Sequence, residues 1–427
     1  MVIKGNFLYM ENINSLRIVE NGYMLIEDGV IKNVCTELPE EFAQENICDY
    51  GDRLIIPGMT DLHVHAPQYA FRGLGMDKEL LEWLEEYTFP EEKNYAELEY
   101  ADKAYSMFAE DMLESFTTRA CIFGTIHKEA DLLLAKKLDS MGLITYVGKV
   151  NMDRNSPKEL SEDTEQSIKD TRWYIEKVLE QCTYTKPIIT PRFVPSCTDE
   201  IMDELRKLQR EYKLPVQSHL SENLSEIDWV AELNAKSKNY GDAYDMFGLF
   251  GSSGNCVMAH CVYSSEEEQE LMKRNGVFTA HCPNSNINLA SGIAPIRKYL
   301  EKGLKVGLGT DVAGGFSISM FRAIQDAVTV SKLYWRIKDQ TAKPLTTWEA
   351  FYLATMGGGE FFGKVGSFLP GYDADIIVLD DSKYRSPLKL GCKARLERLC
   401  YLADTDVVCA KYVQGRLVYN RKQNGER

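Results

Sequence analysis

The middle of the chain alternates apolar, strand-like runs with amphipathic stretches that have helical spacing. This alternation is typical of a parallel sheet whose strands are connected by helices. The expected strands are the apolar runs at 53–65, 143–150, 186–193, 214–220, 255–260, 276–283 and 305–311. Over about 300 residues, units of this kind are long enough to close into a (β/α)8 barrel. The main body is therefore predicted to be an α/β barrel.

Two of the expected helices have clear start signals. Ser265 and Glu268 form a possible capping box before the segment EEEQELMKR, and Gly276 is placed to end that helix. Thr346 and Glu349 repeat the pattern before EAFYLATM. We expect a helix to begin after each of these threonine or serine residues.

Both ends of the chain read as antiparallel β-structure. Asn21-Gly22 and Asp28-Gly29 separate short apolar runs near the start, and Gln414-Gly415 does so near the end. Such dipeptides favour tight hairpins because both turn positions need positive φ. We predict that the two ends pack together as one small discontinuous domain.

Composition and charge exclude several classes of protein. Lys and Arg number 49 against 64 Asp and Glu, for a net charge of -15, so the overall field repels phosphate backbones and anionic lipid surfaces. No apolar run approaches the roughly 18 residues of a membrane span. The 11 cysteines contain no C-x-x-C pair, and the first residues lack the apolar core of a secretory signal. We expect a cytoplasmic protein with reduced thiols that binds neither nucleic acid nor membrane.

The histidines are few, and most of them end a predicted strand. His63 and His65 are two apart, so they point to the same face of their strand, and His219 ends another strand. Asp311 ends the last strand of the barrel region. Taken singly, a histidine at a strand end is usually a satisfied polar group, but active sites gather at this end of a parallel barrel. The four residues are predicted to hold one Zn²⁺, with Fe²⁺ as the substitute.

Acid–base groups are expected beside this metal. Glu222 lies three residues after His219 and is the predicted proton shuttle, while Asp311 is expected to take a proton from the metal-bound water. His260 either orients that water or supports the site from further away. His281 either orients a ligand or caps the turn at Pro283-Asn284. His127 is predicted to be structural or exposed to solvent.

Several motifs together resemble the metal-dependent amidohydrolase superfamily. They are PGMTDLHVH (57–65), HLSE (219–222), MAH (258–260), GLGTD (307–311) and the closing strand at 371–380. The resemblance implies a (β/α)8 barrel over 58–366 and a small β-sandwich formed by 1–57 and 367–427. Many members hold two metals bridged by a lysine or glutamate at the end of the fourth strand. The run at 190–193 offers neither residue, which implies a single ion per chain.

Within the superfamily the sequence is most similar to the guanine deaminases. The segments that carry this likeness are HAPQY (65–69), LLEWLEEYTFPEE (80–92), PRFVPSC (191–197) and HCPNSN (281–286). The likeness implies that the metal ligands are His63, His65, His219 and Asp311. It implies that the purine-contacting or catalytic residues are Gln68, Arg192, Phe193, Glu222 and His260.

These residue types suit a flat polar ring. Gln68 both donates and accepts hydrogen bonds, and Arg192 presents a rigid fork to a carbonyl oxygen, although which edge each reads stays open. Phe193 is expected to stack on the ring, together with Trp83, Tyr87 and Phe89 unless these pack in the core. The segment 69–90 is predicted to be a lid.

The reaction that the resemblance implies is hydrolytic deamination of guanine to xanthine and ammonia. A metal-bound hydroxide would attack C2 while Glu222 protonates the neighbouring ring nitrogen. The alternatives are a related amidohydrolase acting on adenine-type nucleosides, cytosine, pterins or triazines, and a non-catalytic scaffold. The unrelated zinc base deaminases combine H-x-E with P-C-x-x-C; the sequence has an H-x-E at 127–129 but no P-C-x-x-C. A homodimer is expected because it is common among the proteins that the chain resembles.

Overall fold

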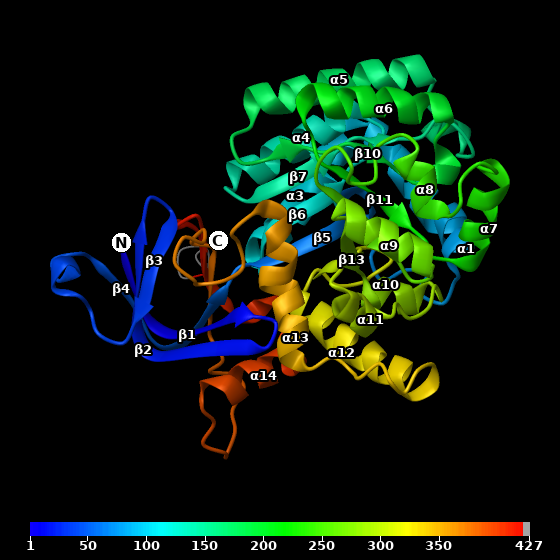
Figure 1. The fold of residues 1–427 in the computed structure, drawn as a ribbon. Coiled ribbons are helices and arrows are strands. Elements are labelled where there is room, and N and C mark those ends of the chain that lie inside the picture. Colours follow the sequence, from blue (N-terminus) through cyan, green and yellow to red (C-terminus); the bar gives the residue numbers. More distant parts are fainter. Residues whose placement is uncertain (422–427) are drawn as a thin grey trace.

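The computed structural model describes residues 1–421 and consists of a barrel beside a separate β-sheet (Figure 1). That sheet has seven strands in the order β17-β16-β15-β4-β1-β2-β3. Their bounds are β1 (Val2–Asn12), β2 (Ser15–Glu27), β3 (Val30–Cys35), β4 (Ile47–Pro57), β15 (Ile376–Leu379), β16 (Val408–Val413) and β17 (Arg416–Asn420). The two ends of the chain therefore share one sheet, because β4 pairs with β1 on one side and with β15 on the other.

The hairpin predicted at Asn21-Gly22 is wrong. Both residues lie inside β2, next to a register shift in its pairing with β1. Asn21 has a φ of 47°, whereas Gly22 does not have a positive φ, so the pair forms an irregularity rather than a two-residue turn. The backbone N–H of Asn21 donates to Asn6 Oδ1 at 2.8 Å. Asp28-Gly29 and Gln414-Gly415 do form turns, with positive φ at all four residues.

The barrel is a ring of parallel strands. Two four-stranded sheets contribute β5 (Met59–His65), β6 (Thr117–Phe123), β7 (Ile144–Gly148), β9 (Lys186–Pro187), β11 (Val216–Leu220), β12 (Cys256–His260), β13 (Phe278–His281) and β14 (Lys305–Leu308). Backbone hydrogen bonds join the two sheets at both seams, from Gln217 N to Ile189 O (2.9 Å) and from Asp311 N to His63 O (2.8 Å). A short extra pair, β8 (Val150–Asn151) and β10 (Thr190–Pro191), continues the ring at one edge. The predicted α/β barrel is confirmed at this level.

Helices cover the outside of the barrel (Figure 1). They are α3 (Leu98–Glu114), α4 (Lys128–Ser140), α5 (Thr164–Gln181), α6 (Asp199–Tyr212), α7 (Leu224–Leu233), α8 (Tyr240–Asp245), α9 (Glu266–Asn275), α10 (Pro283–Asn288), α11 (Ile296–Lys302), α12 (Met320–Ile337) and α13 (Thr347–Tyr352). A further helix, α14 (Cys392–Leu402), packs against α12 and against β1 and β2 of the terminal sheet. Thr346 and Glu349 make both halves of the predicted capping box. At α9 only the half of the capping box that Ser265 makes is present, because the Glu268 carboxylate turns inward and accepts from Ser221 Oγ (2.8 Å).

Several strand predictions need correction. The run at 53–65 is two strands, β4 and β5, divided at Gly58, where a Cβ would lie 2.3 Å from Thr118 Oγ1. The run at 143–150 covers β7 and the start of β8, and the run at 186–193 contains β9 and β10. A further strand, β6, was not expected from the sequence, and its seven residues are all buried. Arg119 in the middle of β6 breaks its apolar pattern, and this charge is buried in ion pairs. A strand that buries a charge on one face cannot be recognised from hydrophobic periodicity alone.

Arg119 links the barrel to the terminal sheet. Its Nε lies 2.7 Å from Asp375 Oδ2, and its Nη2 lies 2.7 Å from Asp373 Oδ2. Replacing Arg119 by Met leaves the fully buried Asp375 without a counter-charge, so we expect the free energy of unfolding to fall by about 3–5 kcal/mol. Denaturant titration of the variant measures this loss. Arg17→Met is the control, because its ion pair with Glu11 is exposed and is worth about 1 kcal/mol or less. Equal losses of unfolding free energy for the two variants would contradict the assignment of Arg119 as a stabilising link between the barrel and the terminal sheet.

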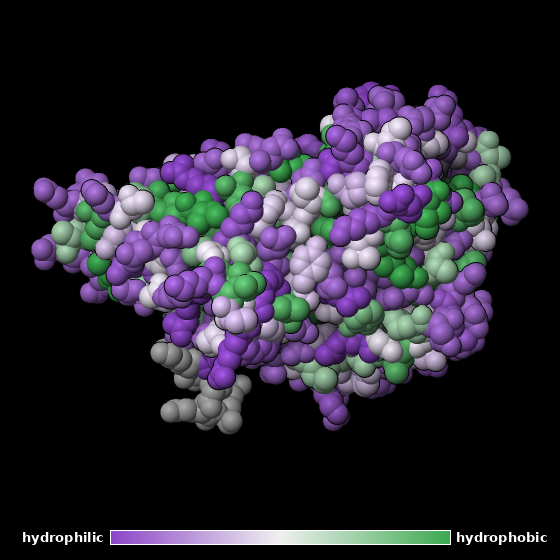
Figure 2. Space-filling view, turned by 90° about the horizontal axis from the view of Figure 1, so that it is seen from below, coloured by the Kyte–Doolittle hydropathy of each residue, from purple (hydrophilic) through white to green (hydrophobic). Residues whose placement is uncertain are grey.

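The surface carries hydrophilic residues between separate apolar patches on the face seen in Figure 2. Across residues 1–421, none of the helices is both long enough and apolar enough to cross a membrane. All 11 cysteines lie in this part of the chain, and each is a free thiol.

Candidate active site

Three imidazoles and one carboxylate meet at the carboxyl ends of barrel strands. His63 and His65 end β5, and His219 lies on β11. The Nε2 atom of His65 is 3.2 Å from Nε2 of His63 and 3.3 Å from Nε2 of His219. Asp311 follows β14, and its Oδ1 lies 3.1 Å from His63 Nε2. Residues that are far apart in the sequence are thus brought to one point by closure of the barrel.

Burial sets the charge of these groups. Desolvation lowers the pKa of His63, His65 and His219, so each ring is neutral and has a lone pair to offer. Burial alone would raise the pKa of Asp311, but His63, His260 and His65 outweigh it and hold that pKa well below its usual range. The cluster therefore combines neutral nitrogen donors with an ionised oxygen donor.

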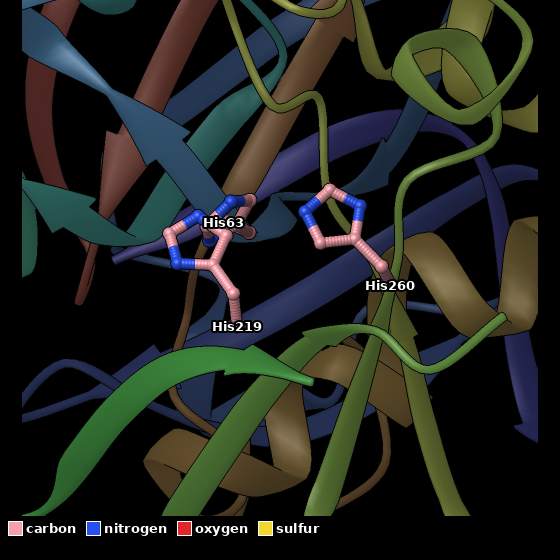
Figure 3. Close-up of side chains that lie close together, drawn as sticks. All are labelled: His63, His219 and His260. Atoms are coloured by element: carbon pink, nitrogen blue, oxygen red, sulfur yellow. The ribbon is translucent and has the colours of Figure 1, made fainter. Parts of the chain in front are cut away.

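This donor set fits a metal ion. Two neutral Nε2 atoms that face one another at 3.2–3.3 Å need either a proton or a metal cation between their lone pairs. His63, His65 and Asp311 form one group that could hold such an ion, and His63, His219 and His260 form another. Figure 3 shows that the last three rings come from different strands and gather in one region. Imidazole with carboxylate is a ligand set of zinc sites.

Neighbouring groups hold the ligands in place. His219 Nδ1 lies 2.6 Å from the carbonyl oxygen of Arg192, which leaves Nε2 for the cluster. Asp61, which was not predicted from the sequence, accepts hydrogen bonds from Thr310 Oγ1 (2.5 Å), Thr310 N (3.0 Å) and His63 N (3.2 Å). Burial raises the pKa of Asp61 to about 7. Its place two residues before His63 is the only sequence signal for this role.

Glu222 and His260 face the cluster from one side. Glu222 Oε2 lies 3.5 Å from His260 Nε2, and its Oε1 accepts from Ser291 Oγ at 2.8 Å. His260 Nε2 is 3.8 Å from Asp311 Oδ2, and its Nδ1 is 2.9 Å from Asn286 Oδ1. Burial raises the pKa of Glu222, which favours a carboxyl group that carries a proton. An acid and an oriented imidazole thus lie beside the candidate metal site.

A pocket opens onto these groups. Its lining residues are His65, Gln68, Leu80, Trp83, Leu84, Arg192, Phe193, His219, Glu222, Glu226, His260, Leu289 and Asp311. Sites for small ligands typically combine an apolar lining with a few convergent polar groups. The pocket therefore has the lining of a site for a small polar ring.

The segment predicted as a lid supplies the apolar wall. The segment 69–90 begins within a 3-10 turn (Ala66–Phe71), contains α1 (Leu80–Trp83) and a π-helical turn (Leu84–Thr88), and ends within α2 (Phe89–Glu92). Trp83 lines the pocket although it is only 2% exposed. Tyr87 and Phe89 do not line it, and Phe89 instead lies 5.4 Å from the Arg192 guanidinium. Gln68 and Arg192 both contact Glu92, which the sequence analysis did not single out.

The remaining histidines lie outside the pocket lining. His281 is buried, and neither ring nitrogen has a hydrogen-bond partner among residues 1–421, so its ring does not cap the Pro283-Asn284 turn. Burial lowers its pKa to about 3. His127 is half-buried and precedes α4.

Comparison with known proteins shows the family to which the chain belongs. The amidohydrolase family matches residues 54–418 of the chain. A guanine deaminase from Dictyostelium discoideum is 37% identical, with 98% of each protein covered. The chain belongs to the amidohydrolase family and to its guanine deaminase branch. A guanine deaminase from Escherichia coli is 34% identical over 96% of this amidohydrolase and 94% of the bacterial protein.

Among solved structures, guanine deaminase from C. acetobutylicum with bound guanine in its active site superposes on this amidohydrolase with a TM-score of 0.95. The two are 46% identical, and the match covers 98% of this chain and 99% of the other. The family membership and the barrel inferred from the sequence motifs are therefore confirmed.

Proposed function

We propose that this amidohydrolase deaminates guanine to xanthine and ammonia by hydrolysis. The observation that carries the proposal is that one pocket joins the His/Asp cluster, the buried carboxyl group of Glu222 and the Gln68–Arg192 pair. The likeness to an enzyme that was solved with guanine in its active site supports this choice of ring.

We infer that one Zn²⁺ ion, for which Fe²⁺ can substitute, is held by His63, His65, His219 and Asp311. Such an ion lowers the pKa of a bound water to about 7 and so makes a nucleophile available at neutral pH. The chain's part is to keep three imidazoles neutral and one carboxylate ionised at this point. The hydrogen bond between His219 Nδ1 and Arg192 O fixes which nitrogen of that ring is free to bind.

Proton transfer falls to Asp311 and Glu222, with His260 as an orienting group. Asp311 is placed to accept a proton from the attacking water through Oδ2, the oxygen that faces His260, and to pass it to the departing amino group, which leaves as ammonia. Glu222 is held by Ser291 through Oε1, so Oε2 is the atom placed to deliver a proton to the ring nitrogen next to C2 and to take the proton of the new C2–OH group as the carbonyl forms. His260, anchored by Asn286, orients the attacking water and stabilises the charge that develops on its oxygen.

Base recognition falls to Gln68, Arg192 and Phe193. Gln68 and Arg192 offer donors and an acceptor to the polar edges of the ring, and Phe193 offers an apolar face. A site that hydrogen-bonds such edges rejects analogues that lack them, because its buried polar groups are then left unpaired. Leu80, Trp83 and Leu84 close the apolar side and exclude water.

The test is a spectrophotometric assay of metal-replete protein with guanine, cytosine and adenosine. We expect ammonia and xanthine from guanine and no product from the other two. Product from cytosine or adenosine with none from guanine would point to a related deaminase. Product from no substrate would support the scaffold alternative.

Three further parts of the proposal concern the protein as a whole. We infer a homodimer in the cytoplasm. We also infer that the barrel domain spans 58–366 and that the terminal β-sandwich domain consists of 1–57 and 367–427. Size-exclusion chromatography with light scattering measures the oligomeric state directly.

A further inference from the structure

Glu92, the last residue of α2, lies behind the two side chains proposed to read the base. Its carboxylate Oε1 accepts from Gln68 Nε2 at 3.0 Å and from Arg192 Nη2 at 3.1 Å, and its Oε2 accepts from Arg192 Nη1. Glu92 is 1% exposed and does not line the pocket. We infer that Glu92 is a positioning residue that sets the preference for a neutral, oxo-bearing purine. The inference rests on the proposed function.

The first consequence is the orientation of Gln68. An amide group can be turned either way round unless its partners differ. Here the backbone N–H of Ala313 donates to Gln68 Oε1 at 3.2 Å, while the side chain of Glu92 accepts one N–H of Nε2. The second N–H and the second lone pair of Gln68 are then fixed in place for the base. An amide at position 92 would accept this N–H less strongly and could also present its own amino group, so the orientation of Gln68 would no longer be fixed.

The second consequence is the charge of Arg192. Its guanidinium is held through two nitrogens by one carboxylate, and both partners are at most 5% exposed. A buried pair of this kind has fixed geometry and no net charge. Arg192 therefore offers donors to a carbonyl oxygen without attracting anions. A neutral base fits this arrangement, whereas an anionic purine finds no uncompensated positive charge there.

The deciding variant is Glu92→Gln, assayed with full metal loading. We expect the KM for guanine to rise by about 10- to 100-fold, because a buried charged hydrogen-bond partner is lost. The kcat should change far less, since Glu222, His260 and Asp311 do not contact Glu92. The second readout is inhibition by xanthine, measured at a pH above the first pKa of xanthine, where xanthine is an anion. In the Glu92→Gln variant the positive charge of Arg192 has no counter-charge, so it should attract this anion. The ratio of the inhibition constant for xanthine to the KM for guanine should therefore fall.

A purely structural role for Glu92 would change this ratio little, because both ligands would bind more weakly by the same factor. The control is Glu91→Gln, because Glu91 is in the same helix but bonds to Tyr100 and Asn94 instead. We expect wild-type constants for this control. The shorter, still charged Glu92→Asp variant should raise the KM for guanine without strengthening xanthine inhibition, and it replaces the Gln variant if that one does not fold.

The outcomes separate the two proposals. A wild-type protein that does not deaminate guanine overturns the proposed function. An active wild type whose Glu92 variants keep the KM for guanine, or weaken guanine and xanthine equally, overturns only the role of Glu92. The role of Glu92 is also overturned if Glu91→Gln changes the kinetic constants as much as Glu92→Gln does, or if neither Glu92 variant folds.

Discussion

Replacing Glu222 by Gln is expected to lower kcat for guanine by about 10²- to 10⁴-fold, the usual contribution of general acid–base catalysis. The amide keeps the shape of the side chain and its contact with Ser291, but it cannot deliver a proton. Metal content should stay at the wild-type level, because Glu222 is not among the residues grouped as possible metal ligands. Steady-state kinetics and elemental analysis of the same preparation measure both quantities.

The control for this variant is Glu232→Gln, an exposed carboxylate near the end of α7. It should keep the wild-type kcat. A Glu222→Gln protein with normal metal content and normal kcat would remove Glu222 from the mechanism. A variant without metal would instead make Glu222 part of the metal site.

Removing the metal is the second change with a large expected effect. Dialysis against a chelator should abolish deamination, and added Zn²⁺ should restore it. Because the metal binds the folded chain, its removal should also lower the free energy of unfolding, by about 4 kcal/mol at a metal concentration 1,000 times the Kd. Thermal denaturation with and without Zn²⁺ measures this linkage.

His219→Ala should behave like the metal-free protein, because it removes one of the clustered Nε2 atoms. His127→Ala is the matched control, since His127 lies at the start of α4 and outside the pocket lining. Full metal content in the His219 variant would show that the ion lies elsewhere.

Much of the barrel was predictable because its strands are apolar and its helices have capping signals. The candidate ligands were predictable for a different reason, since parallel strands all present their carboxyl ends to one mouth. The closure seen between β5 and β14 brings His63 beside Asp311, although 248 positions separate them in the sequence. The motifs predicted which residues are the candidate ligands, and the barrel geometry explains why these residues lie together.

What the sequence did not reveal depends on partners that are distant in the chain. Arg119 hides β6 because its counter-charges, Asp373 and Asp375, lie near the other end of the chain. Glu92 is one of several acidic residues in LLEWLEEYTFPEE, and only the fold shows which of them meets Arg192. In the same way, Asn21-Gly22 was misread because only its pairing with β1 reveals an irregularity within a strand.

The pairing of β4 with β15 has a consequence during synthesis. The free edge of β4 pairs with β15, which is synthesised more than 300 residues after β4. At about 5–20 residues per second, this delay is tens of seconds. Throughout that interval the nascent chain carries an apolar β-edge without its neighbour, a state that invites aggregation. The terminal sheet therefore cannot be completed until the segment that contains β15 has been synthesised. If translation ended early, β4 would lack its partner strand.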